Sequence, residues 1–127
     1  MKQKRIKVLM VEPGKHPFET ELDNDLDSLQ KAVSIGTDYQ GLIEIIPIEP
    51  GVVFLCNEEG KLENLLPNLN FGCDYIAGDC FFVGDDYENG DFKSLTENQI
   101  EEVKSICKER EFIYLIEIDN PDEKEIR

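Results

Sequence analysis

The chain has 127 residues, a length that suits one domain whose core needs no disulfide or metal. Its 28 Asp and Glu against 13 Lys and Arg give a formal net charge of −15 at pH 7, which argues against direct nucleic-acid binding because phosphates would be repelled. The longest apolar runs, residues 52–56 and 112–116, are far shorter than the roughly 20 residues of a membrane helix, and no secretory signal is recognisable, so we expect a cytoplasmic protein without membrane contact.

The cysteines do not show the spacing of a metal site. Cys56, Cys73, Cys80 and Cys107 contain no CxxC pair, and the single histidine, His16, lies far upstream. Tetrahedral zinc sites usually take closely spaced ligand pairs, because two side chains from one turn must converge on the metal. We therefore predict four free thiols, no metal and no cofactor.

A strand pattern and then a helix pattern begin the chain. Ile6–Val11 is apolar and rich in β-branched residues, and Pro13 and Gly14 end it, which predicts a central strand. Apolar residues at helical spacing follow: Leu22, Leu26, Leu29 and Val33. We expect this helix to have Thr20 as its N-cap and to end at Gly36.

Two more strands are predicted in the middle of the chain. Leu42–Ile48 is apolar and β-branched, and Pro47 places it at a sheet edge or a bulge, because proline donates no backbone hydrogen bond. Pro50 and Gly51 form a turn that leads directly into the next predicted strand, Val52–Cys56.

A hairpin is predicted after these strands. Asn57–Gly60 supplies its turn, with Gly60 in the left-handed conformation, and Lys61–Leu66 returns as a short strand that Pro67 ends. We expect residues 68–74 to form an irregular connection.

A buried strand is predicted over Tyr75–Val83. Its alternation places Asp79 on the same face as apolar side chains, which leaves two interpretations. Either the carboxylate is buried and marks a site, or Gly78 introduces a bulge that turns it outward. We favour the bulge.

The second helix has the clearest local signals. Thr96 and Gln99 form the pattern of a capping box, which fixes a helix start. Its apolar face would consist of Ile100, Val103, Ile106 and Cys107. Phe112–Ile118 follows as a final strand and residues 119–127 as a charged tail, so we expect a single domain over residues 1–118. The order β-α-β-β-β-β-α-β predicts an α+β fold with two helices packed on one mostly antiparallel sheet.

Six polar residues are the candidate binding residues: Glu12, His16, Asn57, Glu58, Glu59 and Asp79. All except Glu58 and Glu59 would have to converge in one pocket to form a small-ligand site or an active site. The turn that begins at Asn57 could instead be a recognition loop for another protein. Because no complete catalytic constellation is recognisable, we name no catalytic residue.

Five sequence blocks, in order, point to a known bacterial family. They are VLMVEPGK at 8–15, LDSLQKAV at 26–33, FLCNEEGKLENLLPN at 54–68, IAGDCFFVG at 76–84 and GDFKSLTENQIEE at 90–102. With these blocks the chain resembles an uncharacterised family of small acidic bacterial proteins, a domain of unknown function common in gut Gram-positive bacteria, phages and conjugative elements. It departs from the family at Leu69, where relatives typically have arginine. The resemblance implies a mobile-element context and supplies no catalytic residue.

The leading functional hypothesis is a non-enzymatic protein-interaction module of mobile-element origin, whose protein partner and oligomeric state the sequence leaves open. A second hypothesis is an acidic DNA mimic that inhibits a DNA-binding host protein, since aligned carboxylates can imitate phosphates. Its candidate residues are Asp23, Asp25, Asp27, Asp85, Asp86, Glu88, Asp91, Glu97, Glu101 and Glu102. The mimic requires both helices and the acidic turn to lie side by side. A small-ligand-binding protein or enzyme is the third hypothesis.

Overall fold

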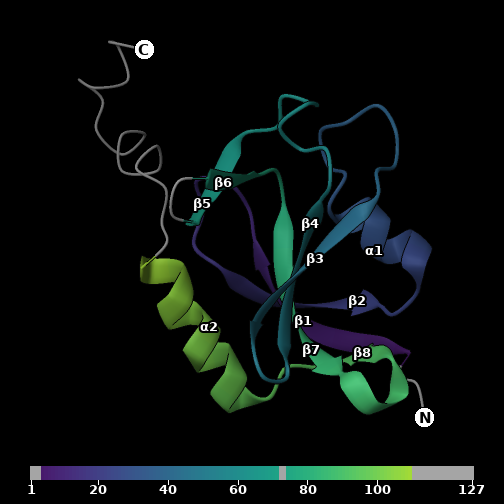
Figure 1. Ribbon diagram of the computed structural model, residues 1–127, viewed down its shortest axis with the longest axis vertical. Coiled ribbons are helices and arrows are strands. Elements are labelled where there is room, and N and C mark those ends of the chain that lie inside the picture. The colour runs from purple at the N-terminus through teal and green to yellow at the C-terminus, as the bar shows by residue number, and fades with distance from the viewer. Residues whose placement is uncertain (1–3, 72–73, 110–127) are drawn as a thin grey trace.

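A six-stranded antiparallel sheet organises the computed structural model, which describes residues 4–71 and 74–109 (Figure 1). The strands run in the order β2-β1-β7-β4-β3, and β8 pairs with β7. They are β1 Arg5–Val11, β2 Phe18–Asp23, β3 Ile43–Glu49, β4 Val52–Asn57, β7 Cys80–Asp86 and β8 Asp91–Lys93. A separate two-stranded sheet consists of β5 Pro67–Phe71 and β6 Asp74–Ala77. The helices are α1 Leu26–Ala32 and α2 Glu97–Glu109, and a 3-10 turn covers Tyr87–Asn89. The α+β class and the mostly antiparallel sheet are therefore confirmed.

Apolar side chains cover both faces of the large sheet. Along β7, Cys80 and Phe82 belong to the core under α2, whereas Phe81 and Val83 belong to the core under α1. The two helices therefore lie on opposite faces, on the left and the right of Figure 1. Burial on both faces explains why the inner strands β1, β4 and β7 are nearly continuous apolar runs in the sequence.

The capping box predicted for α2 is present. The Thr96 backbone N–H donates to the Gln99 side-chain oxygen at 2.9 Å, and the Gln99 N–H donates to the Thr96 hydroxyl oxygen at 3.1 Å. These reciprocal bonds satisfy two backbone donors that a helix start leaves without partners. Three of the four predicted apolar positions are buried, Ile100, Val103 and Cys107, while Ile106 is half-buried against the same core.

The prediction of a helix start at Thr20 was wrong. Thr20 lies in β2, opposite Val8 of β1, and α1 begins only at Leu26 with Asp25 as its N-cap. In residues 18–23 charged side chains alternate with uncharged ones, which also fits a strand, and pairing with β1 supplies backbone hydrogen bonds that stabilise the strand. Leu22 packs on the α1 side of the core from this strand rather than from a helix.

The prediction of a strand at Lys61–Leu66 was also wrong. These residues form consecutive turns, and Pro67 begins β5 instead of ending a strand. The left-handed residue of the segment is Asn64, at φ 59°, and not Gly60. Gly60 is needed for a different reason, since a Cβ there would lie 2.5 Å from the carbonyl oxygen of Ala77.

The predicted strand over Tyr75–Val83 is divided into β6 and β7. Gly78, at φ +90°, and Asp79 separate the two strands, so the apolar run changes sheets at this point. The segment expected to be an irregular connection pairs instead as the β5–β6 hairpin. Pro47 was placed correctly, because β3 is an edge strand and its register shifts between Pro47 and Glu49.

Some predictions concern residues outside the described part of the chain. The final strand at Phe112–Ile118, the tail at 119–127 and the boundary at residue 118 all lie there. Within residues 4–71 and 74–109, neither helix has the length and apolar character needed to cross a membrane.

Candidate functional site

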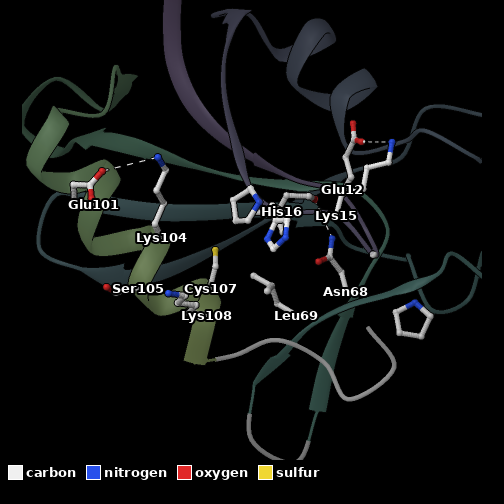
Figure 2. A pocket seen from close by; sticks show the side chains of 14 residues that line it. Glu12, Lys15, His16, Asn68, Leu69, Glu101, Lys104, Ser105, Cys107 and Lys108 are labelled. Atoms are coloured by element: carbon white, nitrogen blue, oxygen red, sulfur yellow. Dashed lines mark hydrogen bonds and ion pairs between the residues drawn. The ribbon is translucent and has the colours of Figure 1, made fainter. Parts of the chain in front are cut away.

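A groove lies between α2, the turn after β1 and the start of β5, and we name it the α2 groove. Its volume is about 370 Å³, in the range of small-molecule sites. Figure 2 shows His16 and Lys104 at its rim, with Cys107 and Leu69 below them. The lining residues are Val11, Glu12, Gly14, Lys15, His16, Pro17, Pro67, Asn68, Leu69, Glu101, Lys104, Ser105, Cys107 and Lys108.

The rim of the α2 groove is basic, although the chain is strongly acidic. Three lysines and His16 line it against two glutamates, a formal charge of +1 with the imidazole neutral. Lys15 pairs with Glu12 at 3.2 Å, and Lys104 reaches Glu101 at 3.9 Å. Both lysine side chains are exposed to water, where ion pairs contribute little to stability.

The floor of the α2 groove is apolar and firmly held. Val11, Leu69 and Cys107 are each at most 3% exposed. Asn68 fixes this floor, because its side-chain amide donates to the carbonyl oxygens of Val11 at 3.0 Å and Gly78 at 2.8 Å. One buried asparagine thus ties β5 to the end of β1 and to the break between β6 and β7.

Of the four residues proposed for a ligand or active site, Glu12 lies near both His16 and Asp79, but His16 and Asp79 line different hollows. Glu12 and His16 line the α2 groove, and Glu12 and Asp79 share a neighbouring shallow hollow with Lys15. Asp79 is neither fully buried nor turned fully outward, the two alternatives that the sequence left open. It is half-buried at the break before β7. Burial, with a smaller contribution from the charge of Glu12, raises the pKa of Asp79 to about 6.

Asn57 does not join this group. It is buried at the end of β4, where its amide donates to the carbonyl oxygen of Val33 at 3.2 Å and its side-chain oxygen accepts from the Glu59 N–H at 2.8 Å. Its role is therefore to hold the loops together. Glu58 and Glu59 are exposed beside it.

Residues 34–42 and 58–66 form two adjoining loops at one end of the sheet, the blue and teal loops at the top of Figure 1, and we name them the loop face. The Glu58 N–H donates to the carbonyl oxygen of Leu42 at 2.9 Å, and the Tyr39 hydroxyl donates to the Glu63 carboxylate. Large apolar side chains are exposed on it: Ile35, Tyr39, Leu42, Leu62 and Leu66. Only four other large apolar side chains are exposed in the described residues.

The buried thiols belong to the core. Cys56, Cys80 and Cys107 are free and buried, whereas Cys73 lies outside the described residues. Burial, and to a smaller extent the nearby Glu44, raises the pKa of Cys56 to about 12, which disfavours a reactive thiolate. Among residues 4–71 and 74–109, no three His, Cys, Asp or Glu side chains come together as metal ligands would.

The acidic segments are not aligned in the way that DNA mimicry requires. The Asn24 side chain donates to the Asp91 carboxylate at 3.3 Å, which places the start of α1 beside β8. The acids of α2, however, belong to the opposite face of the sheet. The two helices therefore do not lie side by side, as the mimic requires.

Sequence reasoning did not find Asn68, Lys104 or Lys108. Lys104 is four residues after Ile100 and three before Cys107, so helical spacing places it at the border of the apolar face, and Lys108 directly follows Cys107. Asn68 stands between apolar neighbours in the run LLPNLNF, which is a recognisable signal for a buried polar residue.

The part of the chain that matches a known family coincides closely with the described fold. A domain of unknown function, DUF3846, matches residues 6–108, nearly the whole span from β1 to the end of α2. Searches of curated proteins and of solved structures returned no match to the chain. The chain belongs to the DUF3846 family.

Proposed function

We propose that this domain is a protein-interaction module whose contact surface is the loop face. The observation that carries the proposal is the concentration of exposed apolar side chains on these two loops. Such concentrations mark protein contact surfaces, because monomers rarely leave large apolar patches in water. Burying Leu62 or Leu66 against a partner would each contribute about 1.5–3 kcal/mol before the costs of association.

The loops are held in place before any partner arrives. Asn57 bonds both to the end of α1 and to the backbone of Glu59, and Gly60 packs closely on the backbone of Ala77. A pre-ordered surface loses less conformational entropy on binding than a mobile one. The loop face is thus suited to recognition with little rearrangement.

The charge at the edge of the loop face favours a partner with basic groups. Glu58, Glu59 and Asp38 are exposed around the apolar side chains. A complementary surface would present an apolar centre surrounded by Lys or Arg. A non-enzymatic role, a cytoplasmic location and a mobile-element origin are parts of the same proposal.

Site-specific photo-crosslinking in the source cells tests this proposal. A photoreactive residue at Leu62 or Leu66, 78% and 56% exposed, should form one discrete adduct with a partner protein. The matched control is the same residue at Leu26, which is 66% exposed but lies on α1. Adding Leu42→Glu should abolish the adduct at Leu62. Equal adducts at Leu26, or none at either loop position, would contradict the proposal.

A further inference from the structure

We infer that the α2 groove binds a small organic anion that has an apolar body, a carboxylate or a phosphate monoester. The groove and the loop face share no residue, although Lys15 of the groove and Leu66 of the loop face line a common shallow hollow, so this site is distinct from the interaction surface proposed above. The inference rests on three features of the groove: its charge, its apolar lining and its anchoring.

Charge distinguishes the α2 groove from other hollows of the described surface. One hollow beside β4 has three glutamates and one lysine, a second beside β3 has Glu49 and Asp85, and a third has Glu12 and Asp79 with Lys15. Each of these is negative, whereas the α2 groove is positive. Among these hollows, the α2 groove therefore has the lining that favours an anion most.

The basic groups come from two segments that face each other across the groove. Lys15 and His16 lie in the turn after β1, and Lys104 and Lys108 lie on the last turns of α2. Lys104 is only loosely engaged, since its carboxylate neighbours, Glu101 and Glu19, are 3.9 and 4.0 Å away. An anion between the two segments would replace these exposed pairs with shorter charge-assisted hydrogen bonds.

The apolar lining determines the rest of the ligand. Its accessible apolar surface comes from Pro17 and Pro67, which are half-buried, because the floor residues Val11, Leu69 and Cys107 are each at most 3% exposed. A fully hydrated inorganic ion would leave this surface unused. A ligand with a short hydrocarbon portion would bury it and place the anionic group at the rim.

The floor cannot collapse easily onto an empty groove. Asn68 holds it from beneath through the carbonyl oxygens of Val11 and Gly78, and its amide also lies 3.3 Å from the Cys80 sulfur. The capping box fixes the start of α2, which forms the opposite wall. The groove is thus built from elements that hold their positions without a ligand.

A series of defined probes tests the inference on the full chain by calorimetry and by NMR shifts of backbone amides. Hexanoate and hexyl phosphate represent the two anion types, hexanol is the neutral control and hexylammonium is the cationic control. We expect both anions to shift amides of residues 12–17 and 101–108, and hexanol to bind at least about tenfold more weakly. Across acetate, butanoate and hexanoate, the Kd should fall by up to about fourfold per buried methylene. The relative Kd of hexanoate and hexyl phosphate identifies the preferred anion.

Charge-reversal variants connect binding to the rim. Lys104→Glu and Lys15→Glu should each raise the Kd of hexanoate about tenfold, with Lys104→Gln in between. Lys31→Glu is the matched control, because Lys31 is an exposed lysine on α1, on the other face of the sheet. It should change the Kd less than about twofold.

Three results would overturn the inference. Hexanol could bind as tightly as hexanoate, which would make the groove merely apolar. Lys31→Glu could weaken binding as much as Lys104→Glu, which would make the effect one of net charge. All probes could leave residues 12–17 and 101–108 unshifted up to millimolar concentrations, which would exclude the site. None of these results depends on whether the loop face binds a protein.

Discussion

The loop face and the α2 groove each depend on one buried asparagine, yet the two surfaces differ in charge and in the exposure of their apolar side chains. Asn57, 6% exposed, joins the end of α1 to the turn after β4, and Asn68, 7% exposed, joins β5 to β1 and to the β6–β7 break. The loop face exposes apolar side chains inside an acidic edge, whereas the groove hides them below a basic rim. The same kind of anchor therefore supports two surfaces, and charge decides which partner suits each.

The largest expected effect comes from removing these two anchors. Asn68→Ala should lower the free energy of unfolding by about 3 kcal/mol, because two buried carbonyl oxygens lose their donor. Asn57→Ala should cost about 2 kcal/mol, since one carbonyl and one N–H lose a partner near the surface. Urea denaturation of both variants measures the difference.

Hydrogen exchange shows whether the two anchors act separately. Asn57→Ala should speed amide exchange in residues 34–42 and 58–66 and leave residues 101–108 unchanged. Asn68→Ala should speed amide exchange at the floor of the groove, around Val11 and Leu69, and leave residues 34–42 and 58–66 unchanged. If either variant accelerates exchange equally in both regions, the two surfaces are one cooperative unit and the comparison fails.

Asp79 provides the second test, because its hollow is lined both by Glu12 and Lys15 of the groove and by Ile35 and Leu66 of the loop face. Its folded pKa of about 6 is above the ordinary value of 3.8, so ionising it in the folded protein is unfavourable. Well below pH 3.8 the group is neutral in both states and costs nothing. Between about pH 4 and pH 6 the unfolded chain releases the proton first, so the stability of the fold falls over this window, and above about pH 6 the cost is constant.

Asp79→Asn should therefore stabilise the protein at pH 7 and have little effect at pH 3. A fully buried group with this pKa would contribute about 3 kcal/mol, and the half-exposed site reduces our expectation to about 1.4 kcal/mol. Denaturation at both pH values measures the gain. Glu12→Gln is the control, since removing that charge should lower the pKa of Asp79 in an NMR titration. A gain that is equal at both pH values would mean that charge is not the cause.

Local sequence patterns predicted the elements whose signals are complete within a few residues. The strand at Ile6–Val11, the edge strand that contains Pro47 and the capping box of α2 were all placed correctly. Errors arose where a distant partner decides the conformation. Residues 18–23 became a strand because β1 pairs with them, and Gly60 is required because Ala77 passes close by.

The candidate site was partly predictable for the same reason. Glu12 and His16, named from the sequence as candidates, both line the α2 groove. Asn57 was expected in the same pocket, but it serves as a buried anchor for the loops. Lys104 joins His16 in the groove only through the packing of α2 against β1, which sequence spacing does not reveal.

Thr96→Ala gives the smallest of these effects and tests one wall of the groove. The hydroxyl of Thr96 accepts from the Gln99 N–H at 3.1 Å, and its loss leaves a backbone donor at the helix start without a partner inside the protein. We expect the free energy of unfolding to fall by about 1 kcal/mol, with the first turn of α2 exchanging faster and the loop face unchanged. Thr96→Ser keeps the hydroxyl and should retain most of the stability. If Thr96→Ala and Thr96→Ser melt at the same temperature, the cap does not stabilise α2, and the wall of the groove must be held by the packing of Ile100 and Val103 alone.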